Sequence, residues 1–438
     1  MYVSSHSKLL HSGKIHNMPA EDLNADDAVE EKIHDSRHHG SVFSGYTVMA
    51  KSLLGSGMLS IAFACAKSGL IIGVILLVFA AVLTWISLHV ISKLCLEFPS
   101  TDITFYSITE RVLPRFRWLL DVAVIIDCLG SAICFVQVMG GLLGDAFEHM
   151  FGLGPFSKWS LDVLVQCCLV LLLYPLCLMK EITNTKIANI IGLTCLVYVT
   201  VLAMVYTDVS NFASTMLYPK NGSIWAVVSA FPVMIFAFSC QQNLLSVASE
   251  MKGATIGKLS IVTVGAVGTG LLLYVPIMIL PFVTFGYPGP KAQTIFDLLP
   301  QTTPVKIGMI CASLAVSISF VLVIHPIRRS VMSLVYGSEF PTGSIEFRAR
   351  IIIVTVIVAV SVGVAIAAGK SLDTTLAFTG LLGATTCGFT MPCVLFLVHF
   401  GFSAKSAISV TVAVMLVFCI LLYPLGITAI IIGLKGVA

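Results

Sequence analysis

The chain has 438 residues, of which 57% are apolar and only 11% charged, and its mean hydropathy is +0.99. A soluble globular domain is about half apolar and about a quarter charged, so a surface that faces water everywhere is excluded. The charges collect in the first forty residues and in short breaks between apolar runs longer than the roughly 18 residues that cross a bilayer. The sequence therefore predicts an all-α polytopic membrane protein, in which one helical bundle uses nearly the whole chain.

Residues 1–40 form a polar segment that holds six of the ten histidines. Its composition predicts a disordered cytoplasmic tail, and no signal-peptide hydrophobic region precedes the first apolar run. His34, His38 and His39 lack cysteine partners and a folded scaffold, so we expect no metal site. The thirteen cysteines lie within or at the ends of apolar runs, which argues against a disulfide framework.

About eleven apolar runs are long enough to cross a bilayer. They lie near residues 42–65, 70–95, 118–145, 160–179, 187–206, 224–247, 260–285, 305–325, 350–369, 374–399 and 407–433. We therefore expect a transmembrane domain over residues 41–438 with about eleven helices.

The basic residues are distributed unevenly between the two sides of this arrangement. With the N-terminus in the cytoplasm, seventeen of the twenty-five lie on the cytoplasmic side, seven on the other, and Lys51 within a span. Cytoplasmic loops are enriched in lysine and arginine, so we predict a cytoplasmic N-terminus and a C-terminus on the opposite side. Asn221, in an Asn-Gly-Ser sequon, is then a glycosylation candidate on the non-cytoplasmic side.

Two apolar runs contain residues that interrupt a helix in mid-span. The first contains LGSGM from Leu54, and the sixth contains Pro232 followed by the polar run SCQQN from Ser239. Irregular backbone at membrane depth is tolerated where it lines a cavity, and broken helices at equivalent places mark the substrate site of inverted-repeat transporters. Free N–H groups at a break suit a carboxylate, and free C=O groups suit an ammonium. The alternative is that the glycines form a close-packing surface.

Four stretches of the chain, in order, resemble segments of one known family. They are LLGSGMLSIAFACAKSGL in the first run, FPVMIFAFSCQQNLLSVASEMKG in the sixth, HPIRRSVMSL at the end of the eighth and LGATTCGFTMPCVLFL in the tenth. They resemble the amino acid/auxin permease family, which includes sodium-coupled neutral, proton-coupled and vacuolar amino acid transporters. The resemblance implies a LeuT-like fold with broken helices 1 and 6. Its two inverted repeats would cover residues 42–206 and 224–399, followed by an extra helix at 407–433.

The resemblance also implies a substrate site at the two breaks. Its residues are Gly55, Ser56, Gly57 and Met58 at the carboxylate end, and Phe236, Ala237, Phe238, Ser239 and Cys240 at the amino-group and side-chain end. Ser317 and Ser319 fall where sodium-coupled members place a hydroxyl ligand, although a serine in a helix also bonds its own i−4 carbonyl. Gln241 departs from the family, because many members have a histidine after that cysteine.

Lys51 and Asp127 are ionisable residues within predicted spans, and such residues are functional candidates by default. Lys51 stands where sodium-coupled members often have asparagine, near the usual sodium site between spans one, five and eight, so its ammonium is a candidate substitute for the ion. A buried lysine can also gain and lose a proton, which makes protons a candidate coupling ion. Alternatively, Lys51 snorkels to the interface or pairs with Asp127, and Asp127 lies near the pocket, where it pairs with a cationic substrate.

These features favour a secondary active transporter that moves amino acids by alternating access, independently of sodium. The alternatives are a cationic amino acid or polyamine carrier and an amino-acid-sensing receptor. Catalytic and Walker motifs are missing, so neither an enzyme nor an ATP-driven pump is expected. The expected partners are an amino acid and the lipid bilayer, without nucleic acid, cofactor or metal, and the oligomeric state is left open. The expected location is the plasma membrane or the membrane of a vacuole or lysosome.

Overall fold

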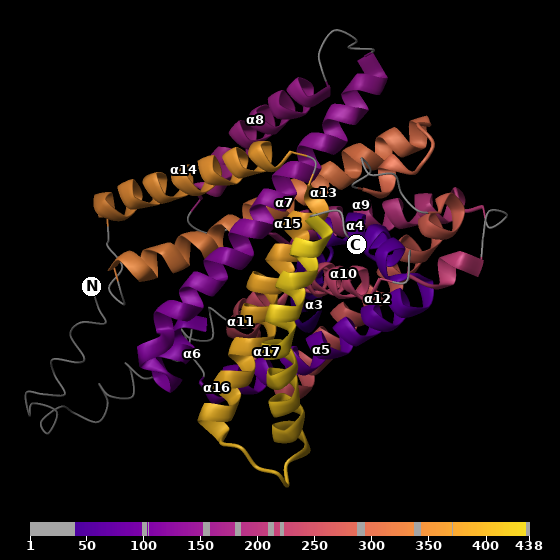
Figure 1. Ribbon diagram of the computed structural model, residues 1–438. Coiled ribbons are helices and arrows are strands. Elements are labelled where there is room, and N and C mark those ends of the chain that lie inside the picture. The colour runs from indigo at the N-terminus through magenta and orange to yellow at the C-terminus, as the bar shows by residue number, and fades with distance from the viewer. Residues whose placement is uncertain are drawn as a thin grey trace, which may run out of the picture.

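A computed structural model describes most of the chain after the N-terminal segment. The described ranges are 40–98, 103, 105–151, 158–179, 185–208, 214–219, 223–286, 294–336, 343–369 and 371–434. Every regular element in these ranges is a helix, and one isolated bridge joins Gly40 to Met251 (Figure 1). The predicted tail, apart from Gly40, and the sequon at Asn221 lie outside the described residues. The expectation of an all-α membrane protein is confirmed.

The helices of the bundle follow one another along the chain. They are α3 (Val42–Leu53), α4 (Ser56–Ser68), α5 (Leu70–Glu97), α6 (Phe105–Val112), α7 (Arg117–Phe151), α8 (Lys158–Cys177), α9 (Thr185–Val205), α10 (Ile224–Ala237), α11 (Gln241–Glu250), α12 (Ile256–Phe285), α13 (Thr303–Tyr336), α14 (Gly343–Ala368), α15 (Leu372–Phe378), the π-helical segments η7 (Thr379–Ala384) and η8 (Thr386–Thr390), α16 (Met391–Phe400) and α17 (Ala407–Leu434). Short connecting helices are η2 (Pro114–Phe116), η4 (Ser214–Leu217) and η6 (Ile295–Asp297).

Nine helical stretches in the described ranges are long and apolar enough to cross a membrane, and the bent pair α3 and α4 makes a tenth. The predicted span at 160–179 is the exception among the eleven. It corresponds to α8, a helix of 20 residues whose apolar part, Leu161–Cys177, has 17, at the lower end of the about 17–25 residues that cross a bilayer.

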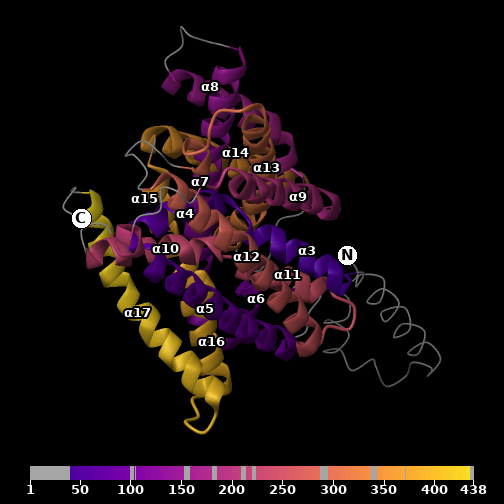
Figure 2. The ribbon, with the colours of Figure 1, turned by 90° about the vertical axis from the view of Figure 1, so that its right-hand side faces the viewer.

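The bundle has central and peripheral helices. In α7 and α13, 61% of the most apolar window is buried, against 28% in α14 and 33% in α17. Both views put α8 and α14 at one side of the bundle and α16 and α17 at the other (Figures 1 and 2). A helix that is apolar all round yet exposed is suited to face lipid. The centre therefore includes α7, α13 and the span of α10 and α11, in which 67% of the window is buried. α7 and α13 meet where the Ser317 hydroxyl lies 3.1 Å from the Met139 sulfur.

The predicted end of the eighth span near the HPIRR segment is wrong. α13 continues through Pro326 to Tyr336. A proline is tolerated inside a membrane helix when neighbouring groups satisfy the backbone around it. Arg328 lies inside this helix, and its guanidinium donates to the carbonyl of Met179, 2.9 Å away. His325 is thus in the helix interior, where its Nδ1 lies 3.1 Å from the same guanidinium, and it is not at a solvated helix end.

Candidate functional site

The first span is broken at the LGSGM segment. α3 ends at Leu53 and α4 has Gly55 as its N-cap, with a bend of 50° between the two helices. No side chain caps α4, so its first backbone N–H groups are available to a ligand. Gly57 contacts the second broken span, because a Cβ there would lie 2.7 Å from the Ala237 Cα. The glycines therefore open the helix and also bring the two spans into backbone contact.

The sixth span is interrupted at Phe238, Ser239 and Cys240, which lie between α10 and α11. The side chain of Gln241 accepts a hydrogen bond from the Cys240 N–H at 2.9 Å, next to the start of α11. The two helices still run on as one span of 27 residues. The interruption is therefore a short irregular segment within one continuous span, and among the described residues only the first span is bent at its break.

Tyr274 of α12 connects the two breaks. Its hydroxyl is buried and lies 2.6 Å from the Leu53 carbonyl and 2.6 Å from the Ala237 carbonyl, the last residues of α3 and α10. A phenol has one proton, so it donates to one of the two carbonyls at a time. Its ring packs edge-on against Phe238. One side chain thus links the ends of both interrupted helices.

Replacing Tyr274 by phenylalanine is expected to reduce substrate affinity without preventing insertion. The change keeps the ring contact but leaves both carbonyls without this donor, and an unsatisfied buried polar group costs about 1–3 kcal/mol. Labelled amino acid binding to the purified protein measures the effect. Tyr198→Phe is the control, since that hydroxyl bonds Pro304 on an exposed part of the bundle. Unchanged binding in Tyr274→Phe would mean that the link does not set the geometry of the breaks.

A polar cavity lies between the two breaks and α7. Its volume is about 490 Å³, open solvent included. The lining residues are Ser52, Leu53, Gly55, Gly57, Asp127, Cys128, Ser131, Phe135, Phe236, Ser239, Cys240, Gln241, Gln242, Asn243 and Val323. Residues of both breaks thus line one cavity.

The residues that the resemblance implied are distributed in two groups. Gly55, Gly57, Phe236, Ser239 and Cys240 line the cavity. The other described members of the set are buried in the packing behind it and do not line it. They are Met58, Ala237 and Phe238. The side chain of Ser56 lies outside the described part of the chain.

Asp127 of α7 forms part of the cavity wall and is only 3% exposed. One of its carboxylate oxygens accepts a hydrogen bond from Gln242 Nε2, and Gln242 Oε1 in turn lies 2.8 Å from the Cys128 sulfur. The other carboxylate oxygen, Oδ1, is buried and has no hydrogen-bond partner. A second hydrogen bond, from the Asn243 side-chain amide to the Ser52 hydroxyl, joins α11 to α3. The cavity therefore offers one unsatisfied carboxylate oxygen.

The π-helical part of the tenth span brings α7 and α10 close to this wall. Gly383 lies directly against the backbone of Asp127, and Gly380 lies against the Pro232 carbonyl. Neither position has room for a Cβ. π-helical segments inside helices are frequent at functional sites, and this one fixes the position of Asp127.

Lys51 is 1% exposed and lies between three helices. Its ammonium donates to the Ser319 hydroxyl of α13 at 2.6 Å and lies 3.4 Å from the Leu54 carbonyl at the first break. Its alkyl stem packs on Gly192 of α9, which has no side chain to oppose it. Within the described residues it has no carboxylate partner, so it neither snorkels to the interface nor pairs with Asp127.

The two serines of α13 bond their own helix, as the alternative expectation allowed. Ser317 donates to the Ser313 carbonyl at 2.8 Å, and Ser319 lies 3.2 Å from the Ala315 carbonyl. Ser319 also accepts from Lys51, whereas Ser317 faces Met139 of α7. Only Ser319 is therefore connected to the first break.

Several residues in or beside the cavity were not singled out from the sequence. Gln242 and Asn243 belong to the polar run that predicted the second break, and Ser52 is next to Lys51. These three could have been identified from the sequence, because polar residues are unusual in an apolar run. Phe135, Cys128 and Tyr274 carried none, since each is an ordinary packing residue of a membrane helix.

A helical bundle with ten candidate spans, and a polar cavity where two of them are interrupted, has the architecture of a membrane transport protein. The comparisons with known proteins agree. A family model described as transmembrane amino acid transporter protein matches residues 38–435. The chain belongs to this family. It is an amino acid transporter of a membrane and not an enzyme.

Three relatives illustrate the similarity. Vacuolar amino acid transporter 5 of Schizosaccharomyces pombe is 25% identical over 354 residues, 80% of this chain and 82% of the relative. Vacuolar amino acid transporter 6 of Saccharomyces cerevisiae is 25% identical over 301 residues, 66% of each chain. Amino acid transporter AVT6E of Arabidopsis thaliana is 22% identical over 400 residues, 85% of this chain and 79% of the relative.

Proposed function

We propose that the protein is a secondary active transporter that binds an amino acid in the central cavity and moves it by alternating access. The observation that carries the proposal is the contact of the two breaks, at Gly57 and Ala237, beside a polar cavity. Free N–H groups at the start of α4 suit the substrate carboxylate. The carbonyls that end α10 are already bonded, so those of Phe238 and Ser239, in the irregular segment between α10 and α11, suit its ammonium. The proposal includes two inverted repeats, over 42–206 and 224–399.

The coupling that we propose follows from Lys51. Its ammonium bridges α13 and the first break, the neighbourhood in which sodium-coupled relatives are expected to bind the ion. The positive charge of the protonated lysine there removes the need for sodium. A lysine away from water can also release its proton, so proton binding at Lys51 is the proposed coupling step.

Uptake of labelled amino acids into proteoliposomes tests the proposal. A panel of neutral, acidic and basic amino acids is offered to vesicles with and without the purified protein. Saturable uptake of at least one of them, inhibited by an excess of the same unlabelled amino acid, is the expected result. Binding without uptake of any member would support a sensing receptor and contradict the transport proposal.

A cationic amino acid or polyamine is a second candidate substrate. The supporting observation is that Asp127 lines the cavity with its Oδ1 atom unsatisfied. A buried acceptor of this kind stabilises an ammonium or guanidinium group by charge-assisted hydrogen bonds. This candidate differs from the first only in the substrate side chain.

Asp127→Asn separates the two candidates. If the carboxylate pairs with the substrate, the variant is expected to lose about 10- to 100-fold in affinity for basic amino acids, because a hydrogen bond to a charged group contributes about 1.5–3 kcal/mol. Uptake of neutral amino acids is expected to change little. Competition of basic and neutral amino acids for one labelled substrate measures both effects. Equal losses for the two classes would rule out the cationic substrate.

We also propose that the membrane is that of a vacuole or lysosome, as the names of two relatives suggest, with a cytoplasmic N-terminus. A glycosylation tag inserted after Gly286, where α12 ends, is expected to be modified in a eukaryotic host. One inserted after Tyr336, where α13 ends, is not. The mobility of the tagged proteins before and after deglycosylation gives the result. The reverse pattern would show that the proposed orientation is wrong.

A further inference from the structure

A second cavity lies away from the two breaks, between α7, α8, the C-terminal end of α14 and η6. Its volume is about 650 Å³, open solvent included. The lining residues are Gln137, Val138, Gly141, Leu142, Asp145, Asp162, Val163, Gln166, Thr294, Asp297, Ala365, Ile366, Gly369 and Leu372. None of these described residues is basic, and three are aspartates. With the proposed topology the cavity is on the non-cytoplasmic side, because it is near the end of α7.

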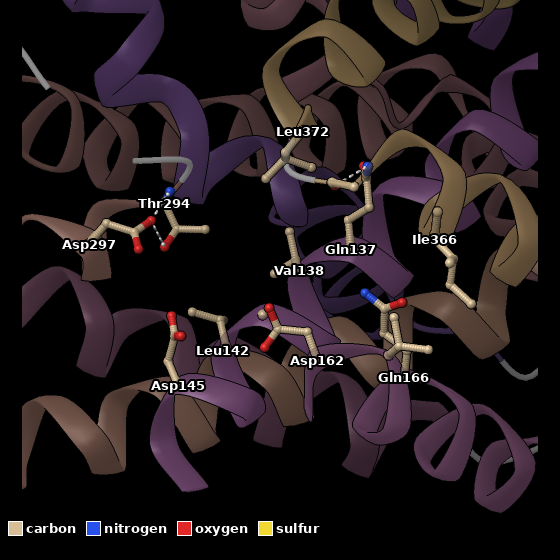
Figure 3. Close-up of a pocket in the computed structure, with 14 residues that line it drawn as sticks. Gln137, Val138, Leu142, Asp145, Asp162, Gln166, Thr294, Asp297, Ile366 and Leu372 are labelled. Carbon is tan, nitrogen blue, oxygen red and sulfur yellow. Dashed lines mark hydrogen bonds between the residues drawn. The ribbon is translucent and has the colours of Figure 1, made fainter. Parts of the chain in front are cut away.

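The polar residues occupy matching faces of two helices. On α7, Gln137, Gly141 and Asp145 are four residues apart, so they lie on one face. On α8, Asp162 and Gln166 have the same spacing. The side chains of Asp162 and Gln166 lie against Gly144 and Gly140 of α7. Figure 3 shows the Asp145, Asp162 and Gln166 head groups rising from these helices towards the space below Gln137.

Two buried amides in this cavity have unsatisfied acceptors. Gln137 is 6% exposed and Gln166 is 7% exposed. The Nε2 of Gln137 donates to the Gly369 carbonyl at 3.2 Å, but its Oε1 has no partner, and neither has the Oε1 of Gln166. Buried polar groups normally have hydrogen-bond partners. These two carbonyl oxygens therefore need a donor that a ligand can supply.

The chemistry of the lining defines the ligand. Carboxylates and amide oxygens are acceptors, so the ligand must carry donors and positive charge. In the described residues no group of three carboxylate, histidine or cysteine side chains is close enough to hold a metal ion. The acceptors are instead spread over two helices and a loop, an arrangement that suits a long cation with several N–H donors.

We propose that this cavity is a second binding site, which captures the alkylammonium or guanidinium group of a basic amino acid or a polyamine before it reaches the central cavity. The role before transport rests on the proposed function, whereas binding of the cation does not. Both ligand sources share the charged group. They differ in the α-carboxylate, which only the amino acid carries.

Binding to the full-length protein in lipid nanodiscs tests the site, with the central cavity closed by Gly57→Val. The probes are lysine, 1,5-diaminopentane, norleucine and sodium chloride, measured by calorimetry. Lysine or the diamine is expected to bind, and the tighter of the two identifies the source. Norleucine has the same chain without the charge and is expected not to bind. Norleucine binding as tight as lysine binding, or displacement of lysine by equimolar sodium, would overturn the proposal.

Two variants locate the binding. Asp162→Asn and Gln166→Leu are each expected to weaken lysine binding about tenfold or more, because hydrogen bonds to a charged group are lost. Glu148→Gln is the matched control, since it removes a carboxylate from the same end of α7 outside the lining residues. An equal loss in the control would indicate a general surface charge effect and overturn the site. Because the readout is binding, a protein that binds lysine at this site but does not transport would contradict only the proposed function.

Discussion

Replacing Gly57 by alanine is expected to reduce amino acid uptake about 10- to 100-fold, since overpacking costs about 1–3 kcal/mol. The added Cβ would lie 2.7 Å from the Ala237 Cα, 2.9 Å from its Cβ and 3.2 Å from its N. These are mainly backbone atoms at the end of α10, so they cannot rotate away. The two broken spans must separate, and the cavity between them loses its shape. Valine at this position is expected to abolish uptake.

Two other glycines make the experiment specific. A Cβ at Gly55 would meet only the ring of Phe135, at 3.4 Å, so Gly55→Ala is expected to have a smaller effect than Gly57→Ala. A Cβ at Gly363 of α14 would meet nothing within 4 Å, which makes Gly363→Ala the control for helix content and insertion. Uptake is normalised to the amount of protein in the membrane. Normal uptake by Gly57→Ala would mean that the break is only a packing surface.

Lys51→Met is expected to abolish accumulation against a gradient and to remove the dependence of uptake on pH. In the unmodified protein, uptake is expected to rise as the side from which the substrate enters is acidified, because proton binding at Lys51 precedes translocation. Methionine keeps the packing on Gly192 but cannot donate to Ser319 or to the Leu54 carbonyl. Exchange of labelled for unlabelled substrate is expected to persist, since it needs no net coupling.

A second lysine provides the control for Lys51→Met. Within the described residues it has no carboxylate partner, so its removal leaves no stranded charge and the variant is expected to fold. Lys258→Met removes a lysine whose ammonium donates to the exposed loop carbonyls of Lys252 and Gly253, and is expected to transport normally. An unchanged pH response in Lys51→Met would move proton coupling elsewhere, with Asp127 the next residue to test. Loss of folding that Asp127→Asn restores would instead reveal an ion pair.

The spans could be predicted closely because a bilayer imposes both length and polarity on a helix. The breaks were visible for the same reason, since LGSGM and SCQQN have no place in an uninterrupted apolar helix. The end of the eighth span was predicted wrongly. Pro326 and the arginines after it are typical of a helix end. The helix nevertheless continues, and the Arg328 guanidinium within it donates to the Met179 carbonyl.

The partners within the site could not be predicted from the residues alone. Asp127 and Gln242 are far apart in the sequence, and nothing in either run specifies the other. Tyr274 resembles any aromatic residue of an apolar run, yet its hydroxyl lies beside both breaks. Such contacts depend on how the helices pack. A single sequence specifies which side chains are polar, but not which of them meet.

Uptake by the unmodified protein in proteoliposomes, with proton and sodium gradients imposed separately, tests the central claim most directly. The claim is that the ammonium of Lys51, held by Ser319 and the Leu54 carbonyl, takes the place of a sodium ion. We predict uptake in sodium-free buffer that increases when the substrate side is acidified and does not respond to added sodium. Uptake that requires sodium would contradict the account.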